Sequence, residues 1–480
     1  MAVLVNGAGT CPARKTGCGG CPLLHLPYET QLAQKQALVQ RLLGQFGPVR
    51  PILGMQDPWQ YRNKVIATVC PGPAGRLQSG FYAAGTHKIT PVSRCLLHHP
   101  RLDEAVQAAR AAAESCRWQP YNEDAGTGLV RHILARHSRA ADQVLVCLVT
   151  AAPALPGSKA FVAKLRQLCP QVSTVVQNIN PRRSSAVLGS AEKVLYGPGY
   201  IQDRLCGVTF RISAGSFYQI NPAQTERLYQ TAIDLAGLDG SQTVVDAYCG
   251  VGTIGLICAA RASRVLGIER NPDAVRCAVQ NARRSGIANA RFLCADASQA
   301  LPRLAAAGET PDLVILDPPR AGSTPEFLNA LCRLAPRRAV YISCNPETQR
   351  RDLLFLTARG WRAEVIQPVD LFPHTEHVET VVLLSKGEVD SKKIRVEFSL
   401  EDMDMSEFQD GATYTQIKDY VLEHSGLKVS NLYISQIKRK CGLEVGKNYN
   451  LPKSEDSRQP QCPPEKEEAI REAFKYFGMI

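Results

Sequence analysis

The sequence predicts an α/β fold whose main part is a doubly wound, mostly parallel sheet of seven strands within residues 216–386. Short apolar runs alternate there with helical stretches, which is the rhythm of βα units. The last two runs have no helix between them, unlike the strands of a plain dinucleotide-binding fold. The expected strands are Thr243–Ala247, Val265–Glu269, Ala290–Cys294, Leu313–Asp317, Ala339–Ser343, Ala363–Val369 and Val378–Leu384, and the clearest helices are Asn271–Ser285, Pro325–Leu334 and Pro346–Thr357.

Length and composition indicate a protein of several domains that binds a polyanion. The 480 residues carry a net charge of +12, which favours RNA or DNA as a partner over an acidic membrane. No apolar run approaches the ~20 residues of a membrane span, and the N-terminus lacks the basic and apolar segments of a secretory signal. The 17 cysteines are odd in number and spread through apolar stretches, which predicts reduced thiols and a cytoplasmic location.

Three cysteines crowd a glycine- and proline-rich stretch near the N-terminus. Cys11, Cys18 and Cys21 have the spacing C-x6-C-x2-C, and a C-x2-C pair lets two thiolates face one metal centre. The two glycines between Cys18 and Cys21 permit a close approach of the backbone. A fourth ligand is needed, and Cys95 is a candidate that the spacing alone does not single out. Four thiolates suit either zinc or an iron–sulfur cluster.

Residues 1–215 are expected to form an irregular, mostly β domain behind one N-terminal helix. The stretch Tyr28–Phe46 places its apolar residues on one helical face, and Gly47-Pro48 ends it. A further helix is expected at Phe161–Leu168. The β-like runs are Tyr61–Val69, Leu129–Arg136, Gln143–Thr150, Val172–Asn178 and Val194–Ile212. Basic residues on these runs could contact phosphates, although solvated strand faces give the same pattern.

Acidic residues end the first three strands of the predicted sheet. Asp246-Ala-Tyr-Cys-Gly-Val-Gly252 closes the first strand, and its glycines let a ligand approach the backbone. Glu269 ends the second strand, where a carboxylate accepts hydrogen bonds from ribose hydroxyls, and Asp296 follows the third, where it can accept one from an adenine amino group. Each acid alone could be a helix N-cap or a solvated turn. Together they predict an adenosine with a cationic tail, and S-adenosylmethionine fits better than NAD because the motif is not G-x-G-x-x-G.

A cysteine follows the fifth strand. Ala339-Val-Tyr-Ile-Ser-Cys-Asn-Pro346 is typical of a buried strand and a turn, which delivers Cys344 to the sheet edge where such folds bind ligands. A cysteine chosen at random is more often a buried structural residue. Cys344 differs because Asp317-Pro-Pro-Arg320 ends the neighbouring strand. Amino-group methyltransferases commonly have an aromatic residue after these prolines, so the arginine indicates chemistry at carbon.

This combination predicts methylation of a pyrimidine at C5. That carbon is a feeble nucleophile until a thiolate adds at C6 and converts the ring to an enolate, which can take a methyl cation. The C5 proton must then leave before the thiolate can. Glu379 at the start of the last strand is the candidate base, and Glu376 and His377 are rivals that the sequence does not rank firmly.

Residues 11–386 resemble the RNA uracil-5-methyltransferase family, in particular its bacterial 23S rRNA members with an iron–sulfur cluster. The motifs that carry the resemblance are Cys18-Gly-Gly-Cys21, Ser216-Phe-Tyr-Gln219-Ile-Asn221, Asp246–Gly252, Asp317–Arg320, Ser343-Cys344-Asn345-Pro346 and His377-Val-Glu379. The resemblance implies a Rossmann-like S-adenosylmethionine methyltransferase domain that forms 5-methyluridine in 23S rRNA. We also expect a protein that works as a monomer and has no membrane partner.

The resemblance assigns roles to individual residues. Cys344 takes the place of the nucleophile, Glu379 that of the base, and Asp317 lies near the methyl donor and the target uracil. The family's S-adenosylmethionine-binding places fall on Gln219, Tyr248, Thr253, Glu269, Asp296 and Asp317. Its [4Fe–4S] ligands fall on Cys11, Cys18, Cys21 and Cys95, which favours the cluster over zinc.

Three alternative functions stay open. The same chemistry could act on the T-loop of tRNA, although the tRNA-modifying branch of the family includes members without the cluster. The protein could be a non-catalytic, cluster-bearing RNA-binding factor, against which the presence of Cys344 and Glu379 argues. An RNA cytosine-5 enzyme usually carries Pro-Cys after Asp-Ala, and this pair is absent after Asp246-Ala247.

Residues 387–480 form an extension that the family core does not need. Helical stretches are expected at Tyr414–His424, Val429–Lys440 and Glu465–Phe477, after an acidic stretch at Glu397–Asp410. The first two resemble a helix-turn-helix in outline, or a plain helical appendage with one charged end. Many family members begin with a small RNA-binding β-barrel, the TRAM domain, which we do not expect here. The extension is a candidate substitute for it.

Overall fold

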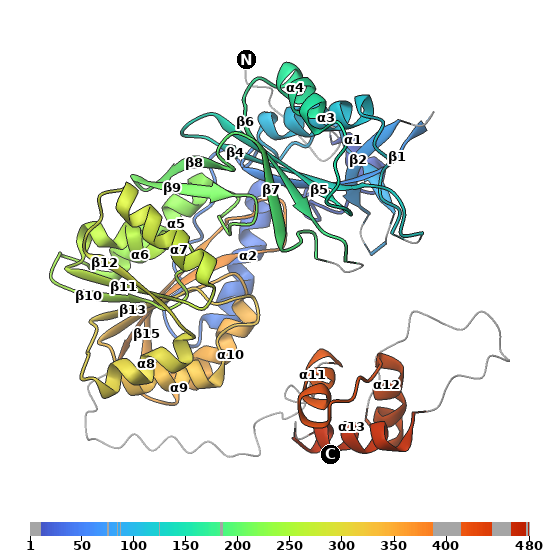
Figure 1. Cartoon of the computed structure of the whole chain (residues 1–480). Helices are drawn as coiled ribbons and strands as arrows, with labels where there is room; N and C mark the ends of the chain where they lie inside the picture. Colours follow the sequence, from blue (N-terminus) through green and yellow to red (C-terminus); the bar gives the residue numbers. More distant parts are fainter. Residues whose placement is uncertain are drawn as a thin grey trace, which may run out of the picture. The chain divides into compact units, whose positions relative to one another are not determined.

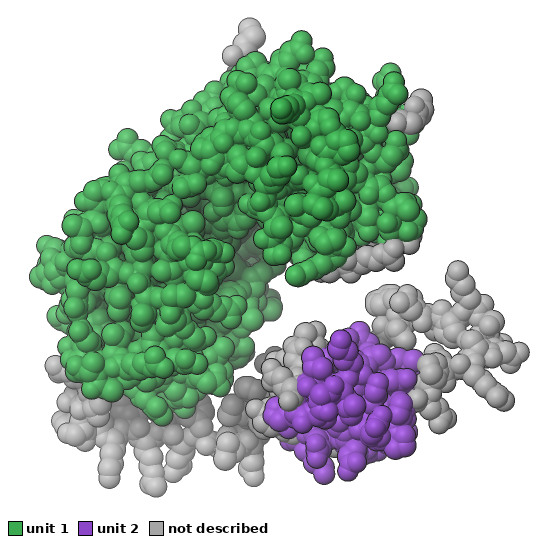
Figure 2. Space-filling model, viewed as in Figure 1, with its two compact units in different colours: residues 1–389 green, residues 390–480 purple. Residues whose placement is uncertain are grey.

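The computed structural model describes residues 11–73, 76–83, 85–86, 88–123, 125–182, 186–386, 414–443, 462–476 and 479. The chain divides into two compact units, residues 1–389 and 390–480 (Figure 2). The acidic stretch predicted at Glu397–Asp410 lies outside the described residues. No described helix combines the length and the hydropathy that a membrane span requires.

One seven-stranded sheet of the first unit has the strand order β12-β11-β10-β13-β14-β16-β15 (Figure 1). Its strands are β10 (Thr243–Asp246), β11 (Arg264–Glu269), β12 (Ala290–Cys294), β13 (Leu313–Leu316), β14 (Arg338–Ser343), β15 (Trp361–Val369) and β16 (Glu379–Lys386). The first five pair in parallel, whereas β16 lies antiparallel to both β14 and β15. The predicted α/β class with seven strands is confirmed, and the final pair without a helix is a hairpin.

Helices cover both faces of this sheet. They are α5 (Pro222–Ala236), α6 (Thr253–Cys258), α7 (Pro272–Arg284), α8 (Ala297–Ala306), α9 (Pro325–Leu334) and α10 (Pro346–Thr357). Along β13, Ile315 packs into the core formed with α5 and α6, and its neighbours Val314 and Leu316 pack into the core formed with α8, α9 and α10. This alternation is what a strand buried on both faces requires.

Four of these helices begin in the same way, with a capping side chain followed by proline at the first helical position. Asn221, Asn271, Thr324 and Asn345 each accept a hydrogen bond from a backbone N–H of the first turn. The cap satisfies an otherwise unpaired donor, and proline has no N–H that would need a partner. The Asn-Pro after Cys344 therefore ends β14 and starts α10 within a few residues.

The helix α2 (Tyr28–Leu43) comes from the N-terminal part but packs on the same face as α10 (Figure 1). Its Val39 and Leu43 are fully buried in the core that this face of the sheet, including β15, forms with α10. The segment after α2 also joins this sheet, since Val49 and Leu53 bridge to Ile366 and Val369 of β15. N-terminal residues thus contact the β15–β16 hairpin, whose second strand begins with Glu379.

The second sheet has the order β3-β2-β1-β4-β5-β6-β7. Its strands are β1 (Lys64–Pro71), β2 (Leu77–Tyr82), β3 (Ile89–Pro91), β4 (Val130–Ser138), β5 (Gln143–Thr150), β6 (Val172–Ile179) and β7 (Ala191–Tyr196). The helices α3 (Pro100–Ser115) and α4 (Ser158–Leu168) pack on one face, and α3 is absent from the sequence prediction. A short helix, α1 (Pro12–Lys15), lies at the N-terminus.

The prediction of a single β-like run at Val194–Ile212 is wrong. These residues contain the end of β7 and the hairpin of β8 (Tyr200–Leu205) and β9 (Val208–Ser213). Gly197, Gly199 and Gly207 have positive φ, a backbone conformation that ends a strand and favours glycine. Because β8 and β9 pack into the core shared with α5 and α6, this hairpin connects the two sheets.

The second unit is a small bundle of α11 (Tyr414–Ser425), α12 (Asn431–Lys440) and α13 (Pro464–Tyr476). Its core includes Ile417, Ile434 and Phe474, each with no exposed surface. Ser430 caps α12 by accepting a hydrogen bond from the Tyr433 N–H at 3.3 Å.

Candidate active site

Cys344 and Glu379 lie opposite each other where β14 ends and β16 begins. The register pairs Ser343 with Thr380, so the next position places Cys344 opposite Glu379. Opposing side chains of an antiparallel pair lie on the same face of the sheet. Burial, and then the neighbouring Glu379 and Asp317, raises the pKa of the Cys344 thiol to about 11. Burial, and then Asp317, raises the pKa of Glu379 to about 8.

Asp317 is the third ionisable group at this edge. It directly follows β13, whose last residue Leu316 pairs with Tyr341 of β14. Burial, and then Asp246, raises the pKa of Asp317 to about 7. These acids crowd one low-dielectric space, and at neutral pH each disfavours ionisation of its neighbours.

Arg320 supplies the positive charge of this cluster. Its guanidinium lowers the pKa values of Cys344 and Glu379, opposing the larger effect of burial. An Arg320 Nη2 lies 2.9 Å from His377 Nδ1. The exposed Arg320 side chain therefore acts electrostatically on both the thiol and the carboxyl.

The two rival bases occupy different surroundings from Glu379. Glu376 and His377 are exposed, whereas Glu379 is only 3% exposed. Burial, and then Arg320, lowers the pKa of His377. Only Glu379 occupies the strand position opposite Cys344, so the geometry favours Glu379.

The turn after β10 forms a cradle of backbone N–H groups around two acids. Asp246 is fully buried, and its Oδ2 accepts from the Gly255 N–H at 2.9 Å while its Oδ1 has no partner. Glu269 accepts from the Gly250 N–H at 3.1 Å through Oε2. Gly252 directly precedes α6 with φ +84°, and a Cβ there would approach the Phe292 ring to 3.0 Å. The turn therefore needs glycine at this position.

The remaining predicted cofactor residues lie at the same edge of the sheet. Tyr248 follows β10 and packs its ring 5.0 Å from that of Phe327, and Thr253 is the first residue of α6. Asp296 caps α8, because its Oδ1 accepts a hydrogen bond from the Ser298 N–H at 2.8 Å. The N-cap role that the sequence left open for Asp296 therefore applies to this oxygen. Gln219 precedes α5, and its carbonyl accepts from Asn63 Nδ2 at 3.0 Å.

Tyr229 of α5 is a site residue that sequence reasoning missed. Its side chain is buried, and the pKa of its hydroxyl is raised by burial and by Asp317, Glu379 and Asp246. Gln219 is its hydrogen-bonding neighbour. A tyrosine on the apolar face of a helix gives no sign in sequence that acids surround it, so only the fold could reveal it.

The N-terminal cysteines lie close to Cys95. A bridge between Cys18 and Ala83, and a 3.1 Å bond from Thr90 Oγ1 to the Thr16 carbonyl, fasten the N-terminal segment to β2 and β3. Burial, and then the nearby Cys95, raises the pKa of Cys21 to about 12. Cys11 and Cys18 also act on Cys21. Among the described residues, no group of three or more His, Cys, Asp or Glu side chains has metal-binding geometry, so the cluster is not shown.

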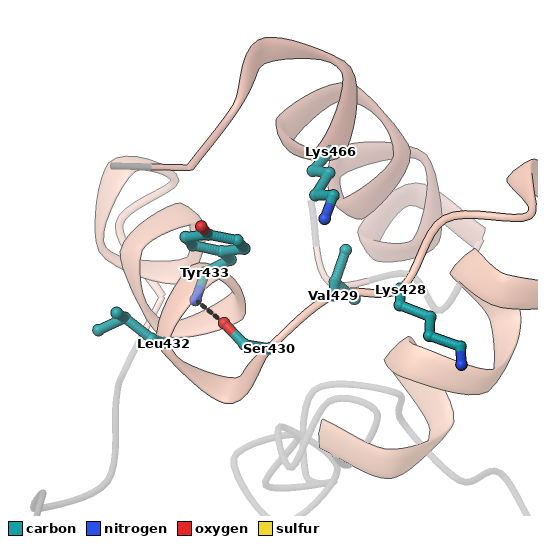
Figure 3. Close-up of a pocket in the computed structure, with 6 residues that line it drawn as sticks. All are labelled: Lys428, Val429, Ser430, Leu432, Tyr433 and Lys466. Atoms are coloured by element: carbon teal, nitrogen blue, oxygen red, sulfur yellow. Dashed lines mark hydrogen bonds between the residues drawn. The ribbon is translucent and has the colours of Figure 1, made fainter. Parts of the chain in front are cut away.

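The second unit contains a shallow pocket of its own, of ≈ 330 Å³. Figure 3 shows Lys466 reaching toward the ring of Tyr433 beside Val429, at the start of α12. The Lys466 ammonium lies 5.9 Å from the centre of the Tyr433 ring. Lys428 also lines this pocket.

The order of the sheet and the acids at its edge define the class of S-adenosylmethionine-dependent methyltransferases. The family model described as "tRNA (Uracil-5-)-methyltransferase" matches residues 189–387. An "Uncharacterized RNA methyltransferase" of Bacillus cereus is 40% identical over 383 residues, which are 79% of this chain and 83% of the relative. Another, from Halalkalibacterium halodurans, is 40% identical over 372 residues, 76% of this chain and 81% of the relative.

A solved structure is similar over most of the chain. It is the Pyrococcus abyssi tRNA (uracil-54, C5)-methyltransferase in complex with S-adenosyl-L-homocysteine, with 28% identity and a TM-score of 0.64. The similarity covers 77% of this chain and 86% of the Pyrococcus chain. The protein belongs to the RNA uracil-5-methyltransferase family and is an S-adenosylmethionine-dependent enzyme.

Proposed function

We propose that the protein forms 5-methyluridine in 23S rRNA, with Cys344 as nucleophile and Glu379 as base. The observation that carries the mechanism is the opposed placement of these two residues where β14 ends and β16 begins. One residue can bond to C6 of the ring while the other reaches the proton on C5. The target base must leave its stack to reach them.

A pKa raised to about 11 keeps most of the Cys344 thiol protonated at neutral pH. We infer that the thiol proton leaves to water as the sulfur bonds to C6, while the Arg320 guanidinium offsets the negative charge that this creates. S-adenosylmethionine supplies the methyl cation that C5 accepts. The Glu379 carboxylate then takes the C5 proton, the electron pair restores the ring double bond, and the Cys344–C6 bond breaks.

The described residues fit S-adenosylmethionine. The buried Asp246 Oδ1 is an unpaired acceptor beside the glycine turn, which suits a cationic group, and Glu269 suits ribose hydroxyls. Asp296 Oδ1 is occupied by the cap of α8, so Oδ2 would meet the adenine. The residues proposed to hold the methyl donor are Gln219, Tyr248, Thr253, Glu269, Asp296 and Asp317.

We also propose that Cys11, Cys18, Cys21 and Cys95 hold a [4Fe–4S] cluster. The support is the donor set itself, four half-buried thiols from two segments held together by β-bridge and hydrogen-bond contacts. Four thiolates suit this cluster. They favour the rRNA branch over the tRNA T-loop, which is the alternative substrate. We place the enzyme in the cytoplasm as a monomer.

Mapping 5-methyluridine in both RNA classes tests the substrate. Total rRNA and tRNA from a deletion strain should lack 5-methyluridine at an rRNA position and keep it in the T-loop. Plasmid-borne wild-type protein should restore the modification, and Cys344→Ala should not. Loss from tRNA alone would contradict the rRNA proposal, and full methylation by Cys344→Ala would restore the hypothesis of a non-catalytic role for this site.

The second unit is our candidate for additional RNA contact. The helix α12 ends in Lys438-Arg439-Lys440, and Lys428 and Lys466 line the pocket at its start. Phosphate contacts of this kind make affinity depend on salt. A full-length Lys428→Glu/Arg439→Glu variant should bind rRNA several-fold more weakly, with a shallower salt dependence. Unchanged affinity and slope would remove RNA binding from the functions of this unit.

A further inference from the structure

The helix α2 contacts the connection between β15 and β16, which comprises residues 370–378. Lys35 Nζ lies 2.6 Å from Asp370 Oδ1, and these side chains are 2% and 0% exposed. Lys35 also donates to the Phe372 carbonyl at 3.1 Å, and Tyr28 donates to Asp370 Oδ2 at 2.7 Å. A buried ion pair needs such additional hydrogen bonds to offset its loss of hydration. The first half of the connection is thereby fixed to α2.

A second contact from α2 fixes His374 in the same connection. Gln31 Oε1 accepts from the His374 N–H at 2.9 Å, and Gln31 Nε2 donates to His374 Nδ1 at 3.1 Å. Trp59 stacks on the imidazole, with ring centres 4.2 Å apart. His374 has φ +67°, which is unfavourable for a residue with a side chain and persists where surrounding contacts impose it. Burial lowers the pKa of His374 to about 4, so the ring stays neutral and Nδ1 can accept.

The connection leads directly into Glu379, the proposed base. Val369 and Glu379 pair with each other across β15 and β16, so the connection leaves and re-enters the hairpin at one level. Its backbone bonds to further elements, from Asn221 Nδ2 to the Leu371 carbonyl at 2.9 Å and from Tyr61 to the Pro373 carbonyl at 3.0 Å. Glu379 is the first residue of β16, so this connection leads directly into it and helps to set its position.

We propose that Gln31 and Lys35 of α2 are positioning residues for Glu379 and act on the step in which the C5 proton is removed. This inference rests on the proposed function. Neither side chain touches the reacting atoms, because both contact the connection before β16. Proton transfer demands hydrogen-bond reach between base and proton, and a misplacement of 1 Å can cost about 100-fold in rate. Methyl transfer to C5 depends on Cys344 and the cofactor site, so it should change much less.

The test follows the covalent adduct through one turnover of the full-length protein. Enzyme is mixed with excess S-adenosylmethionine and an equimolar rRNA fragment, and denaturing gels measure the adduct at Cys344 and the free methylated RNA over time. Gln31→Leu removes the His374 contacts without leaving a buried charge. We expect its adduct to form within about threefold of the wild-type rate and to resolve roughly 10- to 100-fold more slowly.

The chain offers a matched control on the same helix. Gln36 also bridges backbone groups, donating to the Arg50 carbonyl at 3.2 Å and accepting from the Ile52 N–H at 2.7 Å, away from the β15–β16 connection. Gln36→Leu should resolve its adduct at the wild-type rate. Lys35→Met/Asp370→Leu removes both charges, which avoids a lone buried carboxylate, and should slow resolution as Gln31→Leu does.

The outcomes separate the inference from the function on which it rests. Wild-type resolution by a folded Gln31→Leu protein would overturn the positioning role, and so would equal slowing by Gln36→Leu, because the effect would then be general destabilisation. If Gln31→Leu does not fold, the Lys35→Met/Asp370→Leu variant is tested instead, and wild-type adduct resolution by that variant would overturn the positioning role. Absence of any Cys344 adduct with wild-type enzyme would overturn the proposed mechanism.

Discussion

Cys344 and Glu379 stand at opposing positions one residue beyond the Ser343–Thr380 pair of β14 and β16. The antiparallel final strand creates this relationship, because a parallel strand would bring its carboxyl end, and not its first residue, to the edge that Cys344 occupies. β16, which lies between β14 and β15 in the strand order, thus brings the proposed base to the edge of the sheet that carries Cys344.

Replacing Glu379 by glutamine should uncouple the two halves of the reaction. The amide would keep the shape of the side chain but could not take the C5 proton, so the overall rate should fall by about 10²- to 10⁴-fold. The methylated Cys344 adduct should accumulate on denaturing gels with labelled RNA. A Cys344→Ala/Glu379→Gln double variant is the control and should show none. Rapid turnover by Glu379→Gln would assign the proton to another base.

The raised pKa of Glu379 predicts a pH dependence with two opposite signs. Because the base must be ionised, adduct resolution should speed up as pH rises toward about 8 and then level off. Stability should move the other way, since a buried carboxyl with a raised pKa stabilises the fold fully below its unfolded pKa and loses this contribution as pH rises through about 8. The melting temperature of Glu379→Gln relative to that of the wild type should therefore be higher at pH 9 than at pH 6. An unchanged difference would contradict the buried, protonated carboxyl.

Much of the methyltransferase sheet could be predicted from the sequence because its signals are local. Apolar runs bounded by turns marked β12 (Ala290–Cys294) without error, and Asn345-Pro346 marked the start of α10 through cap chemistry. Motif spacing also placed Cys344 and Asp317 at one edge, because parallel strands end together. The placement of Cys344 and Asp317 therefore came from periodicity and turn signals, whereas the roles of Gln219, Tyr248 and Thr253 came from the family resemblance.

What the sequence could not reveal depends on contacts between distant segments. In the sequence, Lys35 is one more lysine of an amphipathic helix, and only the structure shows its buried ion pair with Asp370. Tyr229 likewise occupies a helical apolar position, and only the fold brings three acids to it. The missed helix α3 has an alanine-rich face whose weak hydrophobic contrast hides its period, although it buries seven residues.

Loss of one N-terminal cysteine should remove the proposed cluster. Cys18→Ser leaves three thiolates where four are expected, so protein reconstituted with iron and sulfide under anaerobic conditions should retain much less of both than the wild type. Cys70→Ser is a suitable control, because Cys70 is a half-buried thiol on β1 outside this group. Equal iron and sulfide in Cys18→Ser and wild type would rule out this ligand set, and zinc in place of iron would change the identity of the centre.

Replacing Arg320 by methionine should raise the pKa values of both groups that its charge now lowers. Arg320 opposes the effect of burial on Cys344 and Glu379, and methionine keeps much of the length of its side chain without the charge. Adduct formation and adduct resolution should then require higher pH, so both pH–rate profiles should shift upward in single-turnover measurements. Arg320→Lys keeps the charge and should leave the profiles near those of the wild type, although it loses the guanidinium Nη2 that lies 2.9 Å from His377 Nδ1. A fall in RNA affinity with unshifted profiles would instead make Arg320 a phosphate contact, with no electrostatic part in the chemistry.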